Sequence, residues 1–351
     1  MPNTTSECNI QALISVQVSK LREFPIPTIV VSKCITFEPV RWNGGIITCE
    51  FVEKLKPYVS FVPVCPEVEI GLGVPRDPVR IVLVNGENRL LQPSTGLDFT
   101  DKMKSFAETF LKSLKEVDGF ILKSGSPSSG FKNVKIYPKI EKSSSVARGP
   151  GFFGKAVLES FPYLAIEDER RLLNPRIKEH FLTKLFAFAS FRRVKRSGTM
   201  GELVRFHSEN KYLLTAYNQK ELRVLGRIVA NQEKKPINEL INSYEAHLYN
   251  AFARSPSVGA NVNVMMKTMG YFSHQLSKDE KSFFLSSLEK YKAGRLPLSA
   301  SLSVLKAWII RFKEEYLMNQ TFLEPYPGQL AEVDTIIVDN GGRDYWKKEN
   351  L

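Results

Sequence analysis

Two cysteines and a serine-rich loop carry residue types in this chain that could do chemistry. Cys34 and Cys65 each end a short run of β-branched and apolar residues. A third such run leads into residues 126–130, with the sequence Ser-Pro-Ser-Ser-Gly. Thiolates are soft ligands that bind iron and zinc, so the cysteines could contribute to a metal site. Free cysteines are more often buried structural residues, and this pair alone does not decide between the two interpretations.

The apolar runs in the first half predict strands of an α/β domain. They cover residues 28–34, 59–65, 79–84 and 119–124. Between them, Thr100 is expected to cap a helix over residues 101–116. In a mainly parallel, Rossmann-like sheet, the carboxyl ends of the strands share one edge, and ligands bind there. We therefore expect the two cysteines and the serine-rich loop to converge at that edge.

A G-x-G-x-x-G pattern occurs at Gly149, Gly151 and Gly154. Such glycines can bring a loop close to a nucleotide phosphate when they join a strand to a helix. Here a polar, serine-rich stretch precedes them, and Pro150 lacks an amide for phosphate. A flexible loop leading into a helix is the favoured interpretation, with phosphate binding as the alternative.

The second half has the period of an all-α bundle. Apolar residues recur at helical spacing over residues 176–193, 201–230, 236–253, 261–276, 278–292 and 298–320. Gly294 is well placed to end one helix and Pro297 to begin the next. The expected architecture is therefore an α/β domain followed by a helical bundle joined through short loops.

The first half resembles the domain family of unknown function 523, whose characterised members are thiouracil desulfidases. The matching residues are Ser32–Cys34, Arg41–Gly44, Val64–Glu67, Gly73–Arg76, Arg80 and Ser126–Gly130. The resemblance implies removal of sulfur from a thiolated nucleobase or a similar small thiocarbonyl. It also implies a [4Fe–4S] cluster held by three cysteines, because three protein ligands leave one iron open to substrate sulfur.

The resemblance assigns roles to individual residues. Cys34 and Cys65 match two cluster ligands, and Ser129 stands where the family has the third cysteine. Glu67 and Ser128 match the carboxylate and the hydroxyl that would move protons during catalysis. The implied substrate-binding residues are Arg41, Asn43, Arg76 and Ser126. Arginines in these loops could hold a base, ribose or phosphate, or could form salt bridges that fix the loops.

The serine at position 129 leaves three outcomes for the cluster. The Ser129 oxygen could ligate iron, although a hydroxyl must first lose a proton of high pKa. Cys49 could supply the third thiolate, although it is not at the family's usual position. The site could also be empty, and a labile or lost cluster is the expected outcome.

The second half resembles the domain family of unknown function 1722, often called YbgA-like. The matching residues are Phe206-His207, Lys211-Tyr212, Leu225-Gly226, Asn261–Val264, Gly270–Phe272, Lys281, Pro297-Leu298, Tyr316 and Pro325–Pro327. The stretch Glu169–Pro175 resembles the junction seen where the two families are fused. The expected division is an N-terminal extension at 1–24, domains at 25–168 and 169–328, and a tail at 329–351.

Composition sets outer limits on function. The 351 residues carry a formal charge of +12, and the excess of Lys and Arg is larger in the second half. The four cysteines, too few for a disulfide framework, together with the lack of a signal-peptide pattern or a long apolar run, predict a cytoplasmic protein without a membrane span. The alternative to an enzyme is a non-catalytic module that binds nucleotides or nucleic acid through the basic helical half.

One basic cluster is the sharpest candidate for nucleic-acid contact. Arg192-Arg193 and Lys195-Arg196 lie at the end of a predicted helix. Cations there also complement the helix dipole without any ligand, which is the favoured interpretation.

Overall fold

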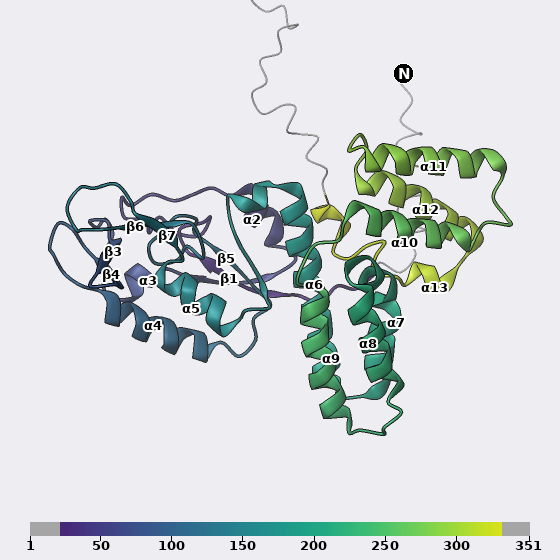
Figure 1. The fold of residues 1–351 in the computed structure, drawn as a ribbon, viewed down its shortest axis with the longest axis horizontal. Helices are drawn as coiled ribbons and strands as arrows, with labels where there is room; N and C mark the ends of the chain where they lie inside the picture. Colours follow the sequence, from purple (N-terminus) through teal and green to yellow (C-terminus); the bar gives the residue numbers. More distant parts are fainter. Residues whose placement is uncertain (1–21, 332–351) are drawn as a thin grey trace, which may run out of the picture.

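A computed structural model describes residues 22–331 of the chain. Figure 1 shows an α/β lobe followed by a group of helices, and α6 (Pro175–Ser197) leads from one to the other. This order confirms the α/β domain and the helical domain expected from the sequence.

The main sheet of the α/β domain is parallel throughout. Its strands are β1 (Thr28–Ser32), β2 (Ser60–Val64), β5 (Gly119–Leu122) and β8 (Ala165–Asp168), in the order β2-β1-β5-β8. Along the chain, β2 is therefore added on one side of β1, and β5 and β8 are then added on the other side. The point between β1 and β5 where the order reverses is a topological switch point, where open α/β sheets bind ligands.

A second, mixed sheet was not expected from the sequence. It contains β3 (Arg80–Val84), β4 (Glu87–Leu91), β6 (Val134–Tyr137) and β7 (Ala147–Gly149), in the order β4-β3-β6-β7. Asn85 and Gly86 both have positive φ, which turns β3 directly into the antiparallel β4. This two-residue hairpin takes the third expected strand out of the main sheet.

The helices of the α/β domain cover its sheets and connect the strands. They are α2 (Glu50–Leu55), α3 (Pro66–Glu69), α4 (Thr100–Ser113) and α5 (Phe152–Ser160). The expectation that Thr100 caps α4 is wrong, because Thr100 is the first helical residue and Phe99 is the N-cap. The Thr100 hydroxyl instead accepts a hydrogen bond from the Leu90 amide at 2.8 Å, which ties α4 to β4.

Within the described residues, the helical domain runs from α6 to α13. Its helices are α6 (Pro175–Ser197), α7 (Met200–Tyr217), α8 (Gln219–Ala230), α9 (Ile237–Ala251), α10 (Val258–Gly270), α11 (Lys278–Lys292), α12 (Leu298–Phe312) and α13 (Glu315–Met318). The single helix expected over 201–230 is two helices, because the Asn218 side chain caps the start of α8. The helix expected over 298–320 ends early, at Lys313, which has a positive φ.

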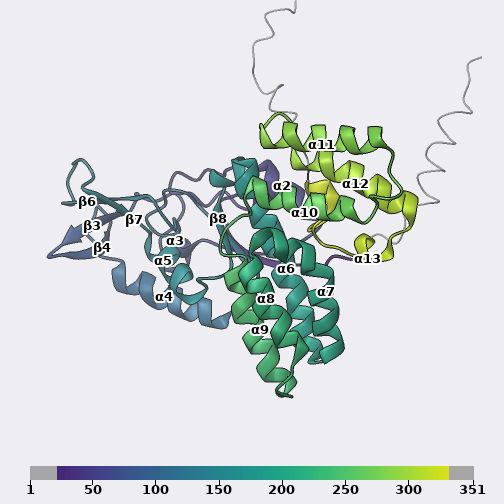
Figure 2. The same ribbon diagram turned by 45° about the vertical axis from the view of Figure 1, so that its right-hand side comes forward.

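Helix α6 belongs to the hydrophobic cores of both domains. Phe181, Leu185 and Phe186 pack in one cluster with Ile29 and other strand residues. Residues further along α6, such as those at positions 188, 191 and 194, pack in the core of the helical domain. Figures 1 and 2 accordingly show α6 between the α/β lobe and the other helices.

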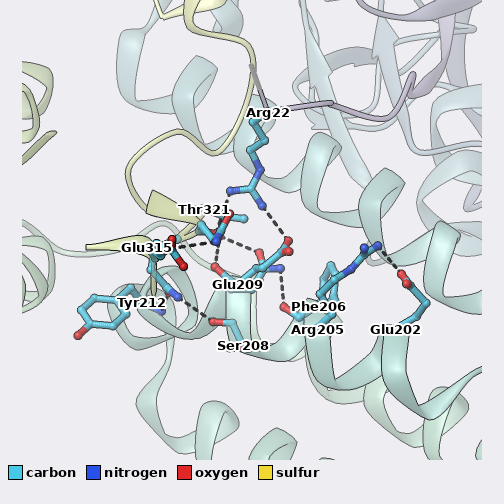
Figure 3. Close-up of polar contacts among 12 residues, drawn as sticks. Arg22, Glu202, Arg205, Phe206, Ser208, Glu209, Tyr212, Glu315 and Thr321 are labelled. Carbon is cyan, nitrogen blue, oxygen red and sulfur yellow. Dashed lines mark hydrogen bonds and ion pairs between the residues drawn. The ribbon is translucent and has the colours of Figure 1, made fainter. Parts of the chain in front are cut away.

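The chain after α13 returns onto α7 and is fixed there by polar contacts (Figure 3). The Thr321 amide donates to the carbonyl of Glu209 at 2.9 Å, and the Gln320 side-chain amide donates to the carbonyl of Ser208 at 2.9 Å. Arg22 forms an ion pair with Glu209 at 3.2 Å. These contacts fix the start of the segment that ends in the buried Leu330.

Among residues 22–331, the helices lack the combination of length and apolar character that crossing a lipid bilayer requires.

Candidate functional site

The strand ends of the main sheet meet at one edge. Ser32 pairs with Val64, and its hydroxyl accepts a hydrogen bond from the Lys123 amide at 2.9 Å. In the neighbouring pair, Leu122 at the end of β5 lies opposite Asp168 at the end of β8. The segments that begin at positions 33, 65, 123 and 169 therefore emerge side by side, as parallel pairing requires.

Three sequence-distant residues form a buried polar cluster at this edge. The Ser128 hydroxyl donates to one Glu67 carboxylate oxygen at 2.6 Å. The other oxygen accepts from Arg76 Nε at 2.8 Å and lies 2.7 Å from Arg76 Nη2. Glu67 and Ser128 are 8% and 1% exposed, so bulk water does not screen this pairing. The structure thus brings the two expected catalytic residues into direct contact.

The serine-rich loop is ordered around the same cluster. Ser126 Oγ lies 2.9 Å from Ser128 Oγ and accepts a hydrogen bond from the Ser129 amide at 3.1 Å. Each hydroxyl can donate and accept, so a chain of hydrogen bonds runs from Ser126 through Ser128 to Glu67. Such a chain fixes the carboxylate and leaves a defined route for a proton.

Arg76 fixes loops as well as Glu67. Its Nη1 donates to the carbonyl of Val40 at 3.0 Å and to that of Gly73 at 3.2 Å. Its own amide donates to the carbonyl of Trp42 at 2.7 Å. The sequence left two roles open for these arginines, substrate binding or a salt bridge that fixes a loop. Among the described residues, Arg76 forms such a salt bridge.

Arg41 and Asn43 lie in a turn beside this loop. The Asn43 side-chain oxygen accepts from the Gly45 amide at 3.2 Å, which stabilises the turn. The Gly44 amide donates to the carbonyl of Arg41 at 2.8 Å. The positive charge of Arg41 also opposes the rise in the pKa of Cys34.

Cys34 and Cys65 are buried thiols close enough to influence each other. The pKa of Cys34 is raised to about 11, mainly by burial and then by the neighbouring Cys65, while the charge of Lys123 opposes the rise. Burial also raises the pKa of Cys65, against the backbone amides at the start of α3. Desolvation favours the neutral form, so both side chains are protonated at neutral pH.

These donors do not fit a cluster that needs three thiolates. Cys49, the candidate substitute, is the N-cap of α2, and its backbone amide donates to the Thr36 hydroxyl at 3.1 Å. At the family's third position Ser129 offers a buried hydroxyl. Within residues 22–331, no three Cys, His, Asp or Glu side chains are arranged to hold a metal ion. Cys8 lies outside the described residues.

The glycine pattern supports the serine-rich loop. At the start of α5, the Phe153 amide donates to the carbonyl of Ser128 at 2.9 Å, and the Gly151 amide donates to that of Gly130 at 2.6 Å. A Cβ on Gly151 would lie 2.6 Å from the carbonyl oxygens of Pro127 and Ser128. These amides are therefore engaged with protein carbonyls, and the glycines allow the two loops to approach closely.

Sequence reasoning missed a second polar network at the same edge. Lys123 Nζ lies 2.7 Å from the Glu169 carboxylate, which also accepts from the Ser124 hydroxyl at 2.6 Å and from its amide at 2.8 Å. Burial opposes ionisation of Glu169, but these hydrogen bonds outweigh it and lower its pKa. The available signal was position, because both segments directly follow strands paired in register.

The basic cluster at the end of α6 is engaged in ion pairs. Arg192 pairs with Asp118 at 2.8 Å, and Lys195 pairs with Glu245 at 2.8 Å. Arg196 forms an ion pair with Glu116, which lies shortly before β5 of the main sheet. Three of the four cations therefore connect elements of this chain, as structural salt bridges do.

Comparison with known families assigns both domains. Residues 29–169 match the model of the 2-thiouracil desulfurase family, and residues 211–327 match that of the protein family of unknown function DUF1722. The chain therefore belongs to the 2-thiouracil desulfurase family and carries a DUF1722 domain after it. This confirms the fusion expected from the sequence.

Each of the individual relatives matches a part of the chain that is no longer than about one domain. The uncharacterized protein YbbK of Bacillus subtilis (strain 168) is 33% identical over 109 residues, which are 29% of this chain and 72% of that protein. The uncharacterized protein YbgA of Escherichia coli (strain K12) is 27% identical over 154 residues, which are 43% of this chain and 91% of that protein. The solved structure of the [4Fe-4S]-dependent thiouracil desulfidase TudS is 26% identical over 42% of this chain and 93% of that chain, with a TM-score of 0.32.

Proposed function

We propose that the α/β domain removes sulfur from the thiocarbonyl group of a thiolated nucleobase of the 2-thiouracil type. The support comes from the family of the chain and from one contact in the structure. That contact is the buried hydrogen bond from Ser128, in the loop after β5, to Glu67, just after β2, at the carboxyl ends of the main sheet's strands. It joins a hydroxyl to a carboxylate in a place where α/β domains bind small ligands.

In this proposal, Glu67 is the general base for a water molecule that attacks the thiocarbonyl carbon. A carbon–oxygen bond forms, the carbon–sulfur bond breaks, and both protons of the water end on the released sulfide. Ser128 hands a proton to Glu67 as it takes one from the water, along the hydrogen bond that already exists. Proton transfer by a positioned side chain typically contributes about 10²–10⁴-fold in rate.

Arg76 prepares this carboxylate for its role. It occupies the Glu67 oxygen that does not accept from Ser128, so the position of the carboxylate is fixed from both sides. Pre-oriented groups need no rearrangement when charge develops in the transition state. Ser126, with Arg41 and Asn43 in the neighbouring turn, is proposed to contact the substrate ring.

No step of this mechanism uses an iron–sulfur cluster, because the three matching positions carry two buried thiols and a hydroxyl where such a cluster needs three thiolates. Whether this chain binds a cluster can be tested directly by metal analysis. The iron and acid-labile sulfide of anaerobically purified protein should remain at background under this proposal.

The test is sulfide release from 2-thiouracil by the full chain under anaerobic conditions. We expect loss of the thiocarbonyl absorbance together with sulfide production, and a fall of at least about 100-fold in kcat for Glu67→Gln. The matched control is Glu69→Gln, which changes an exposed carboxylate on the same short helix. Thermal melting of each variant separates loss of activity from loss of the fold.

Two results would contradict the proposal. One is wild-type protein that, without added iron or sulfide, releases no sulfide above background. The other is Glu67→Gln protein that melts like the wild type and keeps its rate.

A further inference from the structure

The helical domain contains a cavity that the proposed function does not use. It has a volume of about 730 Å³ and is lined by residues of α6, α7, α10, α11, α12 and the segment after α13. It shares no lining residue with the Glu67–Ser128 cluster. Cavities of this size in proteins hold small molecules or groups of side chains from a binding partner.

The walls of this cavity are mainly apolar and belong to the folded core. Leu182 on α6, Leu213 on α7 and Phe322 after α13 line it and are only 1%, 4% and 4% exposed. Val258 on α10 and Leu302 on α12 line it as well and are half-buried. Because the walls come from several helices packed together, an occupant with apolar side chains would meet surfaces that are already in place.

The rim of the cavity carries an excess of positive charge. Five Lys and Arg residues line the cavity, against two acidic residues, Glu179 and Glu324. Glu324 lies 3.9 Å from Lys306, and Glu179 is exposed to solvent. Arg176 and Arg295 are also exposed, and neither forms an ion pair within residues 22–331. An acidic occupant is therefore favoured over a basic one.

The described residues end at this cavity. Leu330 and Ala331 both line it, and Leu330 is buried. Twenty residues follow in the sequence, from Glu332 to Leu351. Since an extended chain spans at most about 3.3–3.6 Å per residue, eight residues reach up to about 26 Å from Ala331. The residues that directly follow Ala331 can therefore reach every wall of the cavity.

The next eight residues match the cavity in composition. Residues 332–339 have the sequence Glu-Val-Asp-Thr-Ile-Ile-Val-Asp. Four of them are apolar and β-branched, three are acidic and none is basic, although the chain as a whole has a formal charge of +12. Gly341-Gly342 then separate this segment from the last nine residues. The segment thus offers apolar side chains for the walls and carboxylates for the arginines of the rim.

Covalent attachment favours this segment over other occupants. A free molecule loses translational and rotational freedom when it binds, whereas a short tether gives a binding group an effective concentration in the millimolar range. An uncharged apolar ligand would leave the arginines of the rim unpaired. An inorganic anion would leave the apolar walls uncovered.

We propose that residues 332–339 of this chain dock in the cavity. Their apolar side chains pack against its walls, and their carboxylates pair with Arg176 and Arg295 at the rim. The segment is then an internal ligand of the helical domain, which closes the cavity to ligands from outside. This inference concerns the helical domain alone and stands apart from the desulfidase proposal.

The experiment is hydrogen–deuterium exchange of the full chain, measured by mass spectrometry. The amides of residues 333–338 should exchange at least about tenfold more slowly than those of a free peptide with the same sequence. The comparison protein is the full chain with Ile336→Asp and Ile337→Asp, in which two charges oppose burial. There we expect rapid exchange of this segment and faster exchange of residues 294–298, which line the cavity.

The matched control is Tyr345→Asp, which places a new charge beyond Gly341-Gly342. It should leave the exchange of residues 294–298 and 333–338 unchanged. An excess of synthetic peptide with the sequence of residues 332–340 should restore slow exchange of residues 294–298 in the doubly substituted chain. The same peptide should have no effect on the wild type, whose cavity is already occupied.

A substitution at the rim tests the role of charge. Arg295→Glu places a carboxylate beside those of the segment, and like charges across an interface repel each other. Exchange of residues 333–338 should therefore become faster in this variant. Circular dichroism establishes that each variant keeps the helical fold.

Three results would overturn the inference. One is exchange of residues 333–338 at the rate of the free peptide in the wild-type chain. Another is equal exchange of residues 294–298 in the wild type and in the doubly substituted chain. The third is slow exchange that disappears on dilution, which would place the segment in the cavity of a second copy. Sulfide release is measured on the other domain, so either proposal can fail while the other stands.

Discussion

The two domains place a glutamate in opposite situations. In the α/β domain, both oxygens of Glu67 are engaged, one by Ser128 and the other by Arg76. In the helical domain, Glu179 lines a cavity of about 730 Å³, is exposed, and has no ion pair with the described residues. The protein itself balances the charge of Glu67, whereas Glu179 is open to solvent.

The two carboxylates are suited to different chemical roles. A carboxylate that is fixed from both sides is suited to act on a substrate without rearranging, as a general base does. An exposed carboxylate without an ion pair can accept hydrogen bonds from water or from a donor that comes from outside. The comparison makes predictions whose sizes differ from site to site.

The largest expected effect is the gain of a metal centre in the α/β domain. Ser129→Cys supplies a third thiol at the position that the family resemblance implies, and we expect iron to rise from background to about four per chain after anaerobic reconstitution. Iron and acid-labile sulfide analysis measures it, with Ser129→Ala as the control for loss of the hydroxyl. Four irons in the unaltered protein would show that Ser129 or another group already completes the ligand set.

The next effect is on stability, through removal of the partner of Glu67. Arg76→Ala leaves a buried carboxylate unpaired and should lower the free energy of unfolding by about 3–5 kcal/mol. Urea denaturation at pH 7 measures this loss. The control is Arg311→Ala, which removes an exposed pair with Glu280 and should cost at most about 1 kcal/mol. Equal losses of unfolding free energy in the two variants would mean that the Glu67–Arg76 pair does not stabilise the α/β domain.

A smaller loss should follow from the glycines that support the serine-rich loop. A Cβ on Gly154 would overlap the carbonyl of Gly130, so Gly154→Ala should cost about 1–3 kcal/mol and displace Ser128. In contrast, Gly201→Ala meets no atom within 4 Å on α7 and should be neutral or slightly stabilising. Denaturation of both variants provides the comparison, and a harmless Gly154→Ala change would show that the loop is not tightly held.

The smallest expected effect is a gain in stability, and it should follow from substitution of Glu179 in the helical domain. Burial raises the pKa of Glu179 above its ordinary value of 4.5, so its ionised form weakens the folded state. Glu179→Gln should therefore unfold at slightly higher denaturant concentration at pH 7, by less than about 1 kcal/mol because the group is exposed to the cavity. The two proteins should converge below pH 4.5, where the wild-type carboxyl is neutral. A loss of stability at pH 7 would mean that Glu179 already has a favourable partner.

The order of the domains and the convergence of Glu67 with Ser128 could be predicted from sequence. Strand-like runs ending in polar residues locate the parallel edge, and the family resemblance points to the residues there that are expected to act in catalysis. Lys123 and Glu169 were missed because a lysine and a glutamate at strand ends look like ordinary surface residues until the register pairs them.

Other features depended on tertiary packing that local patterns do not show. The glycine pattern was interpreted as a flexible loop, whereas its amides bind the carbonyls of residues 128 and 130. The cavity could not be predicted from sequence, because residues from α6, α10, α12 and the final segment line it together only in the folded chain.

The sharing of α6 between two hydrophobic cores has a consequence for how the molecule unfolds. Residues such as Phe181 and Phe186 pack with strands of the α/β domain, while Phe188 and Phe191 pack in the helical core. Neither core can be exposed to water without breaking the helix that completes the other. The protein should therefore melt in a single cooperative transition, and a cut within α6 should leave two fragments that are each less stable than their portions of the intact chain.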